Sequence, residues 1–463
     1  MRRAVVAGLA TALLPAAAAS ADVGAPGVGD RYFPRAGNGG YDVLHYDLRL
    51  SYAPRRDRLA GTAGIRARAT ASLTRFNLDL NGLRVRRVEV DGRRARFRRA
   101  GSELRITPAA ALAAGQVFTV AVRYGGRPRT VTDSVIGGEP YGFVHTRDGQ
   151  FVAAEPDAAS TWFPCNDHPS DKATYTFRVT VPKGLSTVAN GRLVSRSTRG
   201  GRTTFVWRED SPMATYLATI DTGRWRIRTG RTPGGVPQTV AVDRRLARNR
   251  RNAVRNVFRT TARATDFEAR AFGAYPFGST GAIVDDARFR GQTLGFSLET
   301  QTRPVYSDVR DKLTIAHEIA HQWFGNSVSL RNWSDIWLNE GFASYAEYLW
   351  IDHTTGASAH DVFLVQYRIP AKDRFWKVVI GDPGRRKMFD IAVYYRGAMT
   401  LQALRERIGD GPFFDLLRTW VSTYRHGNAT TQQFMTLAEQ ISGQDLGPFF
   451  RAWLYTPRKP ALR

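Results

Sequence analysis

Hydrophobic and polar residues alternate along most of the first half of the chain. The alternation is clear in residues 41–50 and 64–69, and again in residues 117–122 and 175–181. A period of two, broken by frequent turn residues, is typical of half-buried antiparallel strands. The segment 85–90 is followed by Asp91-Gly92 and a second extended stretch, which is a strong hairpin signal. We therefore expect residues 30–240 to form an all-β, sandwich-like domain.

The periodicity changes after residue 240. Between Asp243 and Ala271 apolar residues recur near helical spacing, and many arginines lie on the opposite face. Short strand-like stretches follow at residues 281–284 and 295–301. Helical patterns then continue to residue 454, most clearly in residues 394–408, 413–424, 430–442 and 446–454. The sequence predicts a second, mainly helical domain over residues 241–463 and an α+β fold class for the whole chain.

Residues 1–21 have the composition of a targeting segment. Two arginines precede an apolar stretch that closes on Ala19-Ser20-Ala21, a small-x-small cleavage pattern. The apolar stretch is short and interrupted by Pro15, which argues against a membrane anchor. We expect a cleaved signal peptide, a secreted or extracytoplasmic protein, and no membrane span after cleavage.

Net charge and cysteine content bear on the partners and the covalent cross-links of the chain. The formal net charge is +26, but the arginines are spread over nearly every segment, so we expect a basic solvated surface and no nucleic-acid partner. Cys165 is the single cysteine, which excludes an intrachain disulfide, and we interpret it as a buried structural residue.

The most specific chemical signal is the run His317-Glu318-Ile319-Ala320-His321. On a helix, the two histidines lie four residues apart, so both imidazoles project from one face and can hold one metal ion. Catalytic zinc takes three protein ligands and keeps one position open. Glu340, at the start of a second apolar-patterned segment, is the candidate third ligand. Glu318 is then free to act as general base toward a water activated at the metal.

The runs HEIAHQWFG and WLNEGFASY, which place 18 residues between His321 and Glu340, resemble the gluzincin zinc aminopeptidases, the family of aminopeptidase N and leukotriene A hydrolase. The resemblance extends over roughly residues 40–460. It implies a thermolysin-like zinc catalytic domain after the β domain, with one zinc ion per chain. The chain ends soon after the 446–454 segment, so we expect no large helical C-terminal domain and a more open site.

The resemblance also implies roles for residues outside the metal motif. The family places a Gln or Glu that binds the substrate's α-amine ten residues before a cysteine, and Glu155 matches that position here. A second amine-binding carboxylate is implied at Glu299, although the surrounding Gly295–Gln301 segment departs from the family's Gly-x-Met-Glu-Asn pattern. Tyr394 matches the tyrosine that donates a hydrogen bond to the developing oxyanion, with Tyr395 as the competing choice.

These residues predict hydrolysis of the N-terminal peptide bond of peptides with a free N-terminus. Two carboxylates that hold the ammonium group would fix the position of the first peptide carbonyl. The sequence leaves two alternatives open. One is a non-peptidase hydrolase on the same zinc scaffold, such as an epoxide hydrolase, and the other is a basic secreted binding protein with a vestigial metal site. Glu347, two helical turns after Glu340, could accept the free ring N–H of a zinc-bound histidine, and a surface carboxylate is the alternative reading of this residue.

Overall fold

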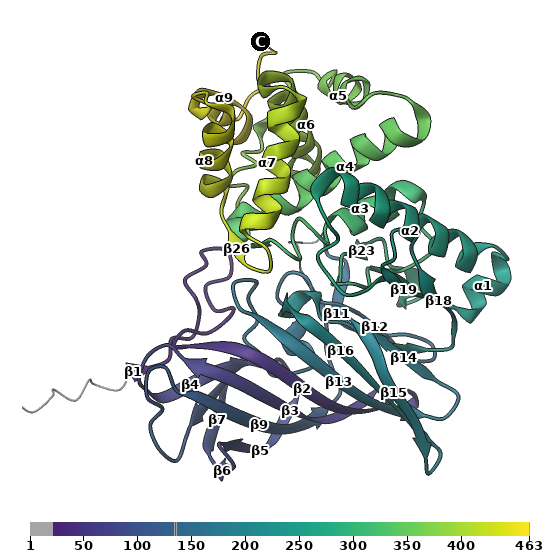
Figure 1. The fold of residues 1–463 in the computed structure, drawn as a ribbon. Helices are drawn as coiled ribbons and strands as arrows, with labels where there is room; N and C mark the ends of the chain where they lie inside the picture. The colour runs from purple at the N-terminus through teal and green to yellow at the C-terminus, as the bar shows by residue number, and fades with distance from the viewer. Residues whose placement is uncertain (1–21, 134, 136, 463) are drawn as a thin grey trace, which may run out of the picture.

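The protein has a β-rich half and a helical half, which form the lower and upper parts of Figure 1. The computed structural model describes residues 22–133, 135 and 137–462, so the predicted signal peptide lies outside the described residues. The expectation of an N-terminal β-rich domain followed by a mainly helical domain is confirmed. Among the described helices, none combines the length and the apolar character needed to cross a membrane.

Three sheets build the β-rich half. In spatial order, the largest contains β15 (Arg192–Arg199), β16 (Arg202–Ala214), β13 (Lys172–Pro182), β2 (Tyr41–Ala53), β3 (Arg58–Ala69), β9 (Val117–Gly126), β5 (Arg84–Val90) and β6 (Arg93–Arg94). The second contains β1 (Asp22–Val23), β4 (Leu73–Asp79), β8 (Glu103–Thr107) and β7 (Arg96–Ala100). The third contains β10 (Thr130–Thr132), β11 (Pro140–His145), β12 (Gln150–Ala153), β17 (Ile220–Gly223) and β14 (Ser186–Ala189).

Local sequence rules account for these strands. In β9 buried and exposed residues alternate, as the period of two requires when one face of a strand packs on the core. The predicted hairpin is confirmed, since β5 pairs antiparallel with β6 across Asp91 and Gly92. Both turn residues have positive φ, 49° for Asp91 and 72° for Gly92. Left-handed backbone at two successive positions is what an Asp-Gly hairpin turn supplies.

A further sheet lies at the junction with the helical half. It contains β18 (Trp225–Arg231), β19 (Pro237–Asp243), β20 (Thr280–Val284), β24 (Val305–Tyr306) and β23 (Ser297–Leu298). The boundary expected between residues 240 and 241 falls inside β19, which pairs in parallel with β20. Hydrogen bonding therefore joins residues 225–243 to the second half of the chain. The predicted boundary missed this because an alternating pattern indicates a strand but does not indicate which sheet the strand enters.

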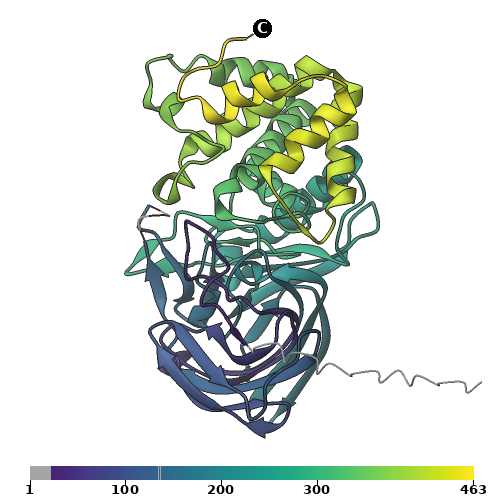
Figure 2. The same ribbon diagram turned by 90° about the vertical axis from the view of Figure 1, so that its left-hand side faces the viewer.

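Helices cover this sheet and form the rest of the second half (Figure 2). They are α1 (Arg244–Asn249), α2 (Ala253–Phe272), α3 (Lys312–Ala320), α4 (Trp337–Thr355), α5 (Ala359–Tyr367), α6 (Ile391–Ile408), α7 (Asp410–Thr423), α8 (Thr431–Ser442) and α9 (Gly447–Phe450), followed by a π-helical turn, Arg451–Tyr455. Short strand pairs join β21 (Arg288–Phe289) to β22 (Gln292–Thr293) and β25 (Ser329–Leu330) to β26 (Asn428–Ala429). Each predicted helical segment thus corresponds to an observed helix.

The two halves are tied together by Lys172 on β13. Its Nζ donates to the carbonyl oxygens of Asn326 at 2.8 Å, Ser327 at 2.9 Å and Gly427 at 3.3 Å. An ammonium group has three donors, so three carbonyls from the helical half satisfy it completely.

Helices α4 and α6 cross at a contact between two glycines. A Cβ atom placed on Gly397 of α6 would lie 2.6 Å from the Cα atom of Gly341 of α4, closer than real Cβ contacts allow. Gly341 follows Glu340, and Tyr394 lies three residues before Gly397 on α6. This close approach therefore sets the distance between the expected oxyanion donor and the expected metal ligand.

We expect Gly397→Ala to lower the stability of the protein by about 2 kcal/mol, because the added methyl group forces two helix backbones apart. Urea unfolding followed by tryptophan fluorescence measures the change. Gly411→Ala on α7 is the matched control, since a Cβ at Gly411 meets no atom within 4 Å. In the control, the better helix propensity of alanine should raise stability by about 0.5 kcal/mol. Equal effects of the two substitutions would contradict the packing role of Gly397.

Candidate metal centre

Helix α3 carries the two histidines of the predicted metal motif. The helix begins at Lys312, where the Asp311 carboxylate accepts hydrogen bonds from the backbone N–H groups of Leu313 at 2.8 Å and Thr314 at 2.9 Å. This cap satisfies donors that a helix N-terminus otherwise leaves unpaired. His317 lies one turn before the helix end and His321 is its C-terminal cap residue, so both rings project toward α4.

His317, His321 and Glu340 converge on one point. The two Nε2 atoms lie 3.1 Å apart, and each lies 3.5 Å from the same oxygen of Glu340. Ligands bound tetrahedrally at zinc distances of 2.0–2.2 Å would be separated by about 3.4 Å. The three donors therefore fit a single zinc ion with a fourth position left for another ligand, as the sequence predicts.

Hydrogen bonds orient both imidazoles. His317 Nδ1 donates to Glu347 Oε1 at 2.7 Å, and His321 Nδ1 donates to the carbonyl of Phe324 at 3.1 Å. With each Nδ1 bound in this way, the Nε2 atom of each ring faces Glu340. Of the two alternatives for Glu347, the structure shows the contact with the ring of His317. Such outer partners fix ring orientation and increase the basicity of the metal ligand.

Four carboxyl groups gather around this point. Glu299, Glu318 and Glu340 are 3%, 6% and 3% exposed, and a carboxylate oxygen of Glu299, one of Glu318 and a ring nitrogen of His321 lie within 4.8 Å of one another. Glu155 is partly exposed, and its Oε1 has no hydrogen-bond partner among the described residues. The Glu155 carboxyl is close enough to interact electrostatically with the other three. The structure thus brings Glu155 and Glu299 to the metal donors from two separate domains.

The electrostatics of this cluster favour bound cations. Burial raises the pKa of Glu318 to about 8, and burial and the neighbouring carboxylates raise the pKa of Glu155 above its usual value. Burial also raises the pKa of Glu299. Burial opposes ionisation of Glu340, but the imidazoles of His321 and His317 outweigh it and lower the pKa of Glu340 to about 2. A dication at the three donors would favour the ionised form of every neighbouring carboxyl.

Tyr394 of α6 lies against the metal donors. Its ring stacks on the imidazole of His317 with centroids 6.1 Å apart and planes 19° apart. Burial raises the pKa of Tyr394 well above its usual value, so the phenol keeps its proton and remains a hydrogen-bond donor. Tyr394 also lines a cavity of about 310 Å³ together with Glu155, whereas Tyr395 does not line it. Of the two tyrosines, the geometry favours Tyr394.

Tyr216 is a site residue that no sequence motif indicated. It lies in a short 3₁₀ turn, Thr215–Leu217, and its hydroxyl donates to Glu299 Oε1 at 3.4 Å. The Glu299 backbone is held as well, because its carbonyl accepts from Gln322 Nε2 at 3.1 Å and Asn326 Nδ2 at 2.7 Å. Glu299 is therefore fixed in place despite the departure of its local sequence from the pattern of the family.

Two family models match the chain along most of its length. Residues 43–217 match the peptidase M1 N-terminal domain, and residues 293–453 match the peptidase family M1 domain, which contains the three metal donors. The chain belongs to peptidase family M1. The predicted membership of the aminopeptidase N-like zinc peptidases is thereby confirmed.

Curated relatives of this M1 chain are longer. Leucyl aminopeptidase of Saccharolobus solfataricus is 27% identical over 347 residues, which is 68% of this chain and 42% of the relative. Glutamyl aminopeptidase of Homo sapiens is 26% identical over 465 residues, which is 90% of this chain and 47% of the relative. The chain therefore spans less than half the length of these two relatives.

Solved structures match the M1 chain over almost its full length. The M1 zinc metallopeptidase from Deinococcus radiodurans superposes with a TM-score of 0.84 at 29% identity and covers 94% of this chain and 98% of its own. A mutant of that protein, bound to the peptide Tyr-Ser-Ala as substrate, superposes with a TM-score of 0.83. The family and these structures indicate zinc as the metal for the donor set of His317, His321 and Glu340.

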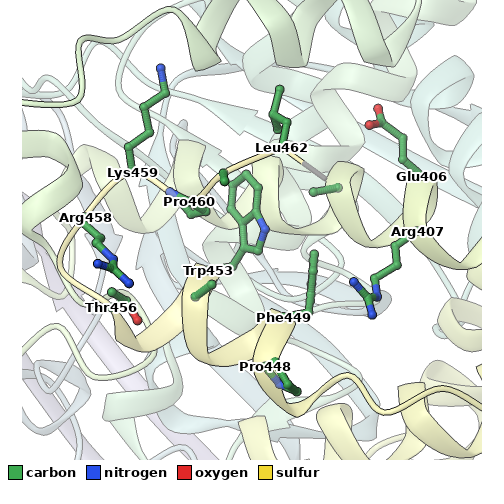
Figure 3. Close-up of a pocket in the computed structure, with 13 residues that line it drawn as sticks. Glu406, Arg407, Pro448, Phe449, Trp453, Thr456, Arg458, Lys459, Pro460 and Leu462 are labelled. Carbon is green, nitrogen blue, oxygen red and sulfur yellow. The ribbon is translucent and has the colours of Figure 1, made fainter.

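A second cavity of about 520 Å³ lies between α6 and the C-terminal segment. Trp453 is one of the side chains that line it, and in Figure 3 its ring lies between Glu406 and Arg407 on one side and Arg458 and Lys459 on the other. None of the predicted site residues lines it. This second cavity is therefore not part of the candidate site.

We expect the purified protein to contain one zinc ion per chain and His321→Ala to lose it, because two remaining donors cannot hold the ion tightly. Metal analysis by inductively coupled plasma mass spectrometry after dialysis measures the stoichiometry. His360→Ala is the matched control, since His360 is exposed and pairs with Glu406 at 2.7 Å, away from the centre. Retention of a full equivalent of zinc by His321→Ala would contradict the ligand assignment.

Proposed function

We propose that this protein is a zinc-dependent aminopeptidase that removes the N-terminal residue from peptides. The observation that supports the proposal most directly is the convergence of Glu155 and Glu299 on the centre formed by His317, His321 and Glu340. No lysine or arginine in the described part of the chain forms an ion pair with any of the three carboxylates Glu155, Glu299 and Glu340. A metal ion and a protonated α-amine are the cations that such a cluster accommodates.

The roles of the residues follow from their positions. Zinc at the three donors would polarise the peptide carbonyl and acidify a water molecule. Glu155 and Glu299 hold the ammonium group and so fix the first peptide bond beside the centre. Glu318 removes a proton from the attacking water and passes it to the leaving nitrogen. Tyr394 donates a hydrogen bond to the oxygen that becomes negative in the transition state, an effect of about 3 kcal/mol for a comparable donor.

The proposal also includes export of the protein from the cytoplasm by a cleaved signal peptide. This part of the proposal rests on the sequence of residues 1–21 alone, with its two arginines, apolar stretch and small-x-small closing pattern. The Deinococcus relative bound to Tyr-Ser-Ala supports a short peptide as the class of substrate for this chain.

We expect leucyl-β-naphthylamide to be hydrolysed in a zinc-dependent reaction and its N-acetyl derivative to be left intact, because acetylation removes the charge that Glu155 and Glu299 bind. Release of naphthylamine, with and without a chelator, measures both reactions. Cleavage that survives acetylation would overturn the aminopeptidase assignment. Zinc-bound protein with no cleavage of either compound would favour the epoxide hydrolase or vestigial-site alternatives.

We expect Glu318→Gln to keep a full equivalent of zinc and to lower kcat by about 10²–10⁴-fold, because the amide cannot accept the water's proton. Parallel measurements of zinc content and leucyl-naphthylamide turnover separate loss of the base from loss of the metal. Glu406→Gln, on the opposite end of α6, serves as the control and should leave both quantities unchanged. Wild-type turnover by zinc-loaded Glu318→Gln would remove Glu318 from the role of general base.

A further inference from the structure

The cavity beside Glu155 and Tyr394 has a second acidic side chain at its rim. The cavity holds about 310 Å³, a volume at the lower end for small-molecule sites. Much of its wall is apolar or aromatic and comes from Tyr141, Ala153, Phe296, Leu298 and Phe389. Glu139, which is half-buried, adds a carboxyl group to this lining.

Strand pairing places Glu139 and Glu155 at the same end of two neighbouring strands in one sheet. Glu139 immediately precedes β11, and Glu155 lies two residues after the end of β12. The two strands are antiparallel, with Gly142 opposite Ala153, so the start of β11 lies beside the end of β12. Glu139 and Tyr141 are two residues apart and therefore face the same side of the strand, toward the cavity.

The Glu139 carboxylate reaches toward the segment that carries Glu299. A Cβ atom placed on Gly295 would lie 3.4 Å from Glu139 Oε1, and Gly295 lies two residues before β23. The carboxylate thus stands at the rim between β11 and the Gly295–Leu298 segment. Glu155, the proposed amine-binding carboxylate, lines the same cavity.

Two arginines near this cavity, Arg385 and Arg310, bind groups other than Glu139. Arg385 pairs with Asp133 at 2.8 Å and lies over the ring of Phe33. Arg310 donates to the carbonyls of Leu294 at 3.4 Å and Phe296 at 3.2 Å. Neither arginine forms an ion pair with Glu139 in the described part of the chain. The Glu139 carboxylate is therefore able to bind a cation that enters the cavity.

We propose that Glu139 determines specificity and makes the enzyme prefer N-terminal arginine and lysine. This inference rests on the proposed aminopeptidase function. With the α-amine held by Glu155 and Glu299, the first side chain enters the cavity. Arginine and lysine have apolar stems that suit its aromatic walls and charged ends that suit the rim carboxylate. Neutral apolar residues match the walls alone, so they are cleaved without this advantage.

Matched substrate pairs test the charge contribution. Arginyl- and citrullinyl-aminomethylcoumarin have side chains of nearly the same shape, but only arginine is charged. We expect kcat/KM to favour arginine about tenfold in the wild type, a modest factor because Glu139 is partly exposed to solvent. In Glu139→Gln the ratio should fall toward one, whereas kcat/KM for leucyl-aminomethylcoumarin should stay unchanged. Glu139→Lys should reverse the ratio.

Controls distinguish this inference from the proposed function. Glu89→Gln removes a carboxylate on β5 that pairs with Arg87, and it should leave the ratio of arginine to citrulline unchanged. Three results would overturn the role of Glu139 alone. They are leucyl turnover with an arginine-to-citrulline ratio of kcat/KM near one in the wild type, an unchanged ratio in Glu139→Gln, and a preference for glutamyl substrates. Absence of turnover of every aminoacyl substrate by the zinc-loaded wild type would overturn the proposed function and this inference with it.

Discussion

The rest of the site depends on one electrostatic constraint, the gathering of four carboxyl groups beside two imidazoles in the protein interior. Unpaired charges in such surroundings cost several kcal/mol each. Because the Nδ1 atoms of His317 and His321 are hydrogen-bonded to Glu347 and Phe324, their Nε2 atoms face Glu340, where a metal ion would bind. Burial raises the pKa of Glu318, Glu155 and Glu299, and bound cations would favour their ionised forms.

The cluster is held together by contacts between elements that are distant in sequence. Glu155 follows strand β12 of the β-rich half, whereas Glu299 follows β23 of the second half. Lys172 joins the halves through three backbone carbonyls, and the contact of Gly341 with Gly397 brings α6 close to α4. These contacts set the geometry of the reaction although none of them involves a reacting atom.

The cavity beside the centre combines two kinds of recognition. Glu155 and Glu139 both line it beside apolar and aromatic side chains. Under the proposed function, Glu155 meets the ammonium group of an unblocked peptide, whereas the wall and Glu139 meet the side chain that differs from peptide to peptide. In the proposed function, the first contact would fix the position of cleavage and the second would set which residue is preferred.

Local spacing in the sequence was sufficient to place His317 and His321 on one face of a helix, Glu340 and Glu347 on one face of the next, and the hairpin at Asp91-Gly92. The meeting of the two helix faces at one centre depended on the folded chain. Helix geometry fixes which residues share a face within a few turns, and a turn's backbone depends on its own residues. Three further features became visible only in the folded chain. They are the sheet that residues 225–243 enter, the hydrogen bond from Tyr216 to Glu299 and the position of Glu139 at the cavity. Strand pairing and helix packing bring these groups together across long stretches of sequence, and no local periodicity encodes which partners meet.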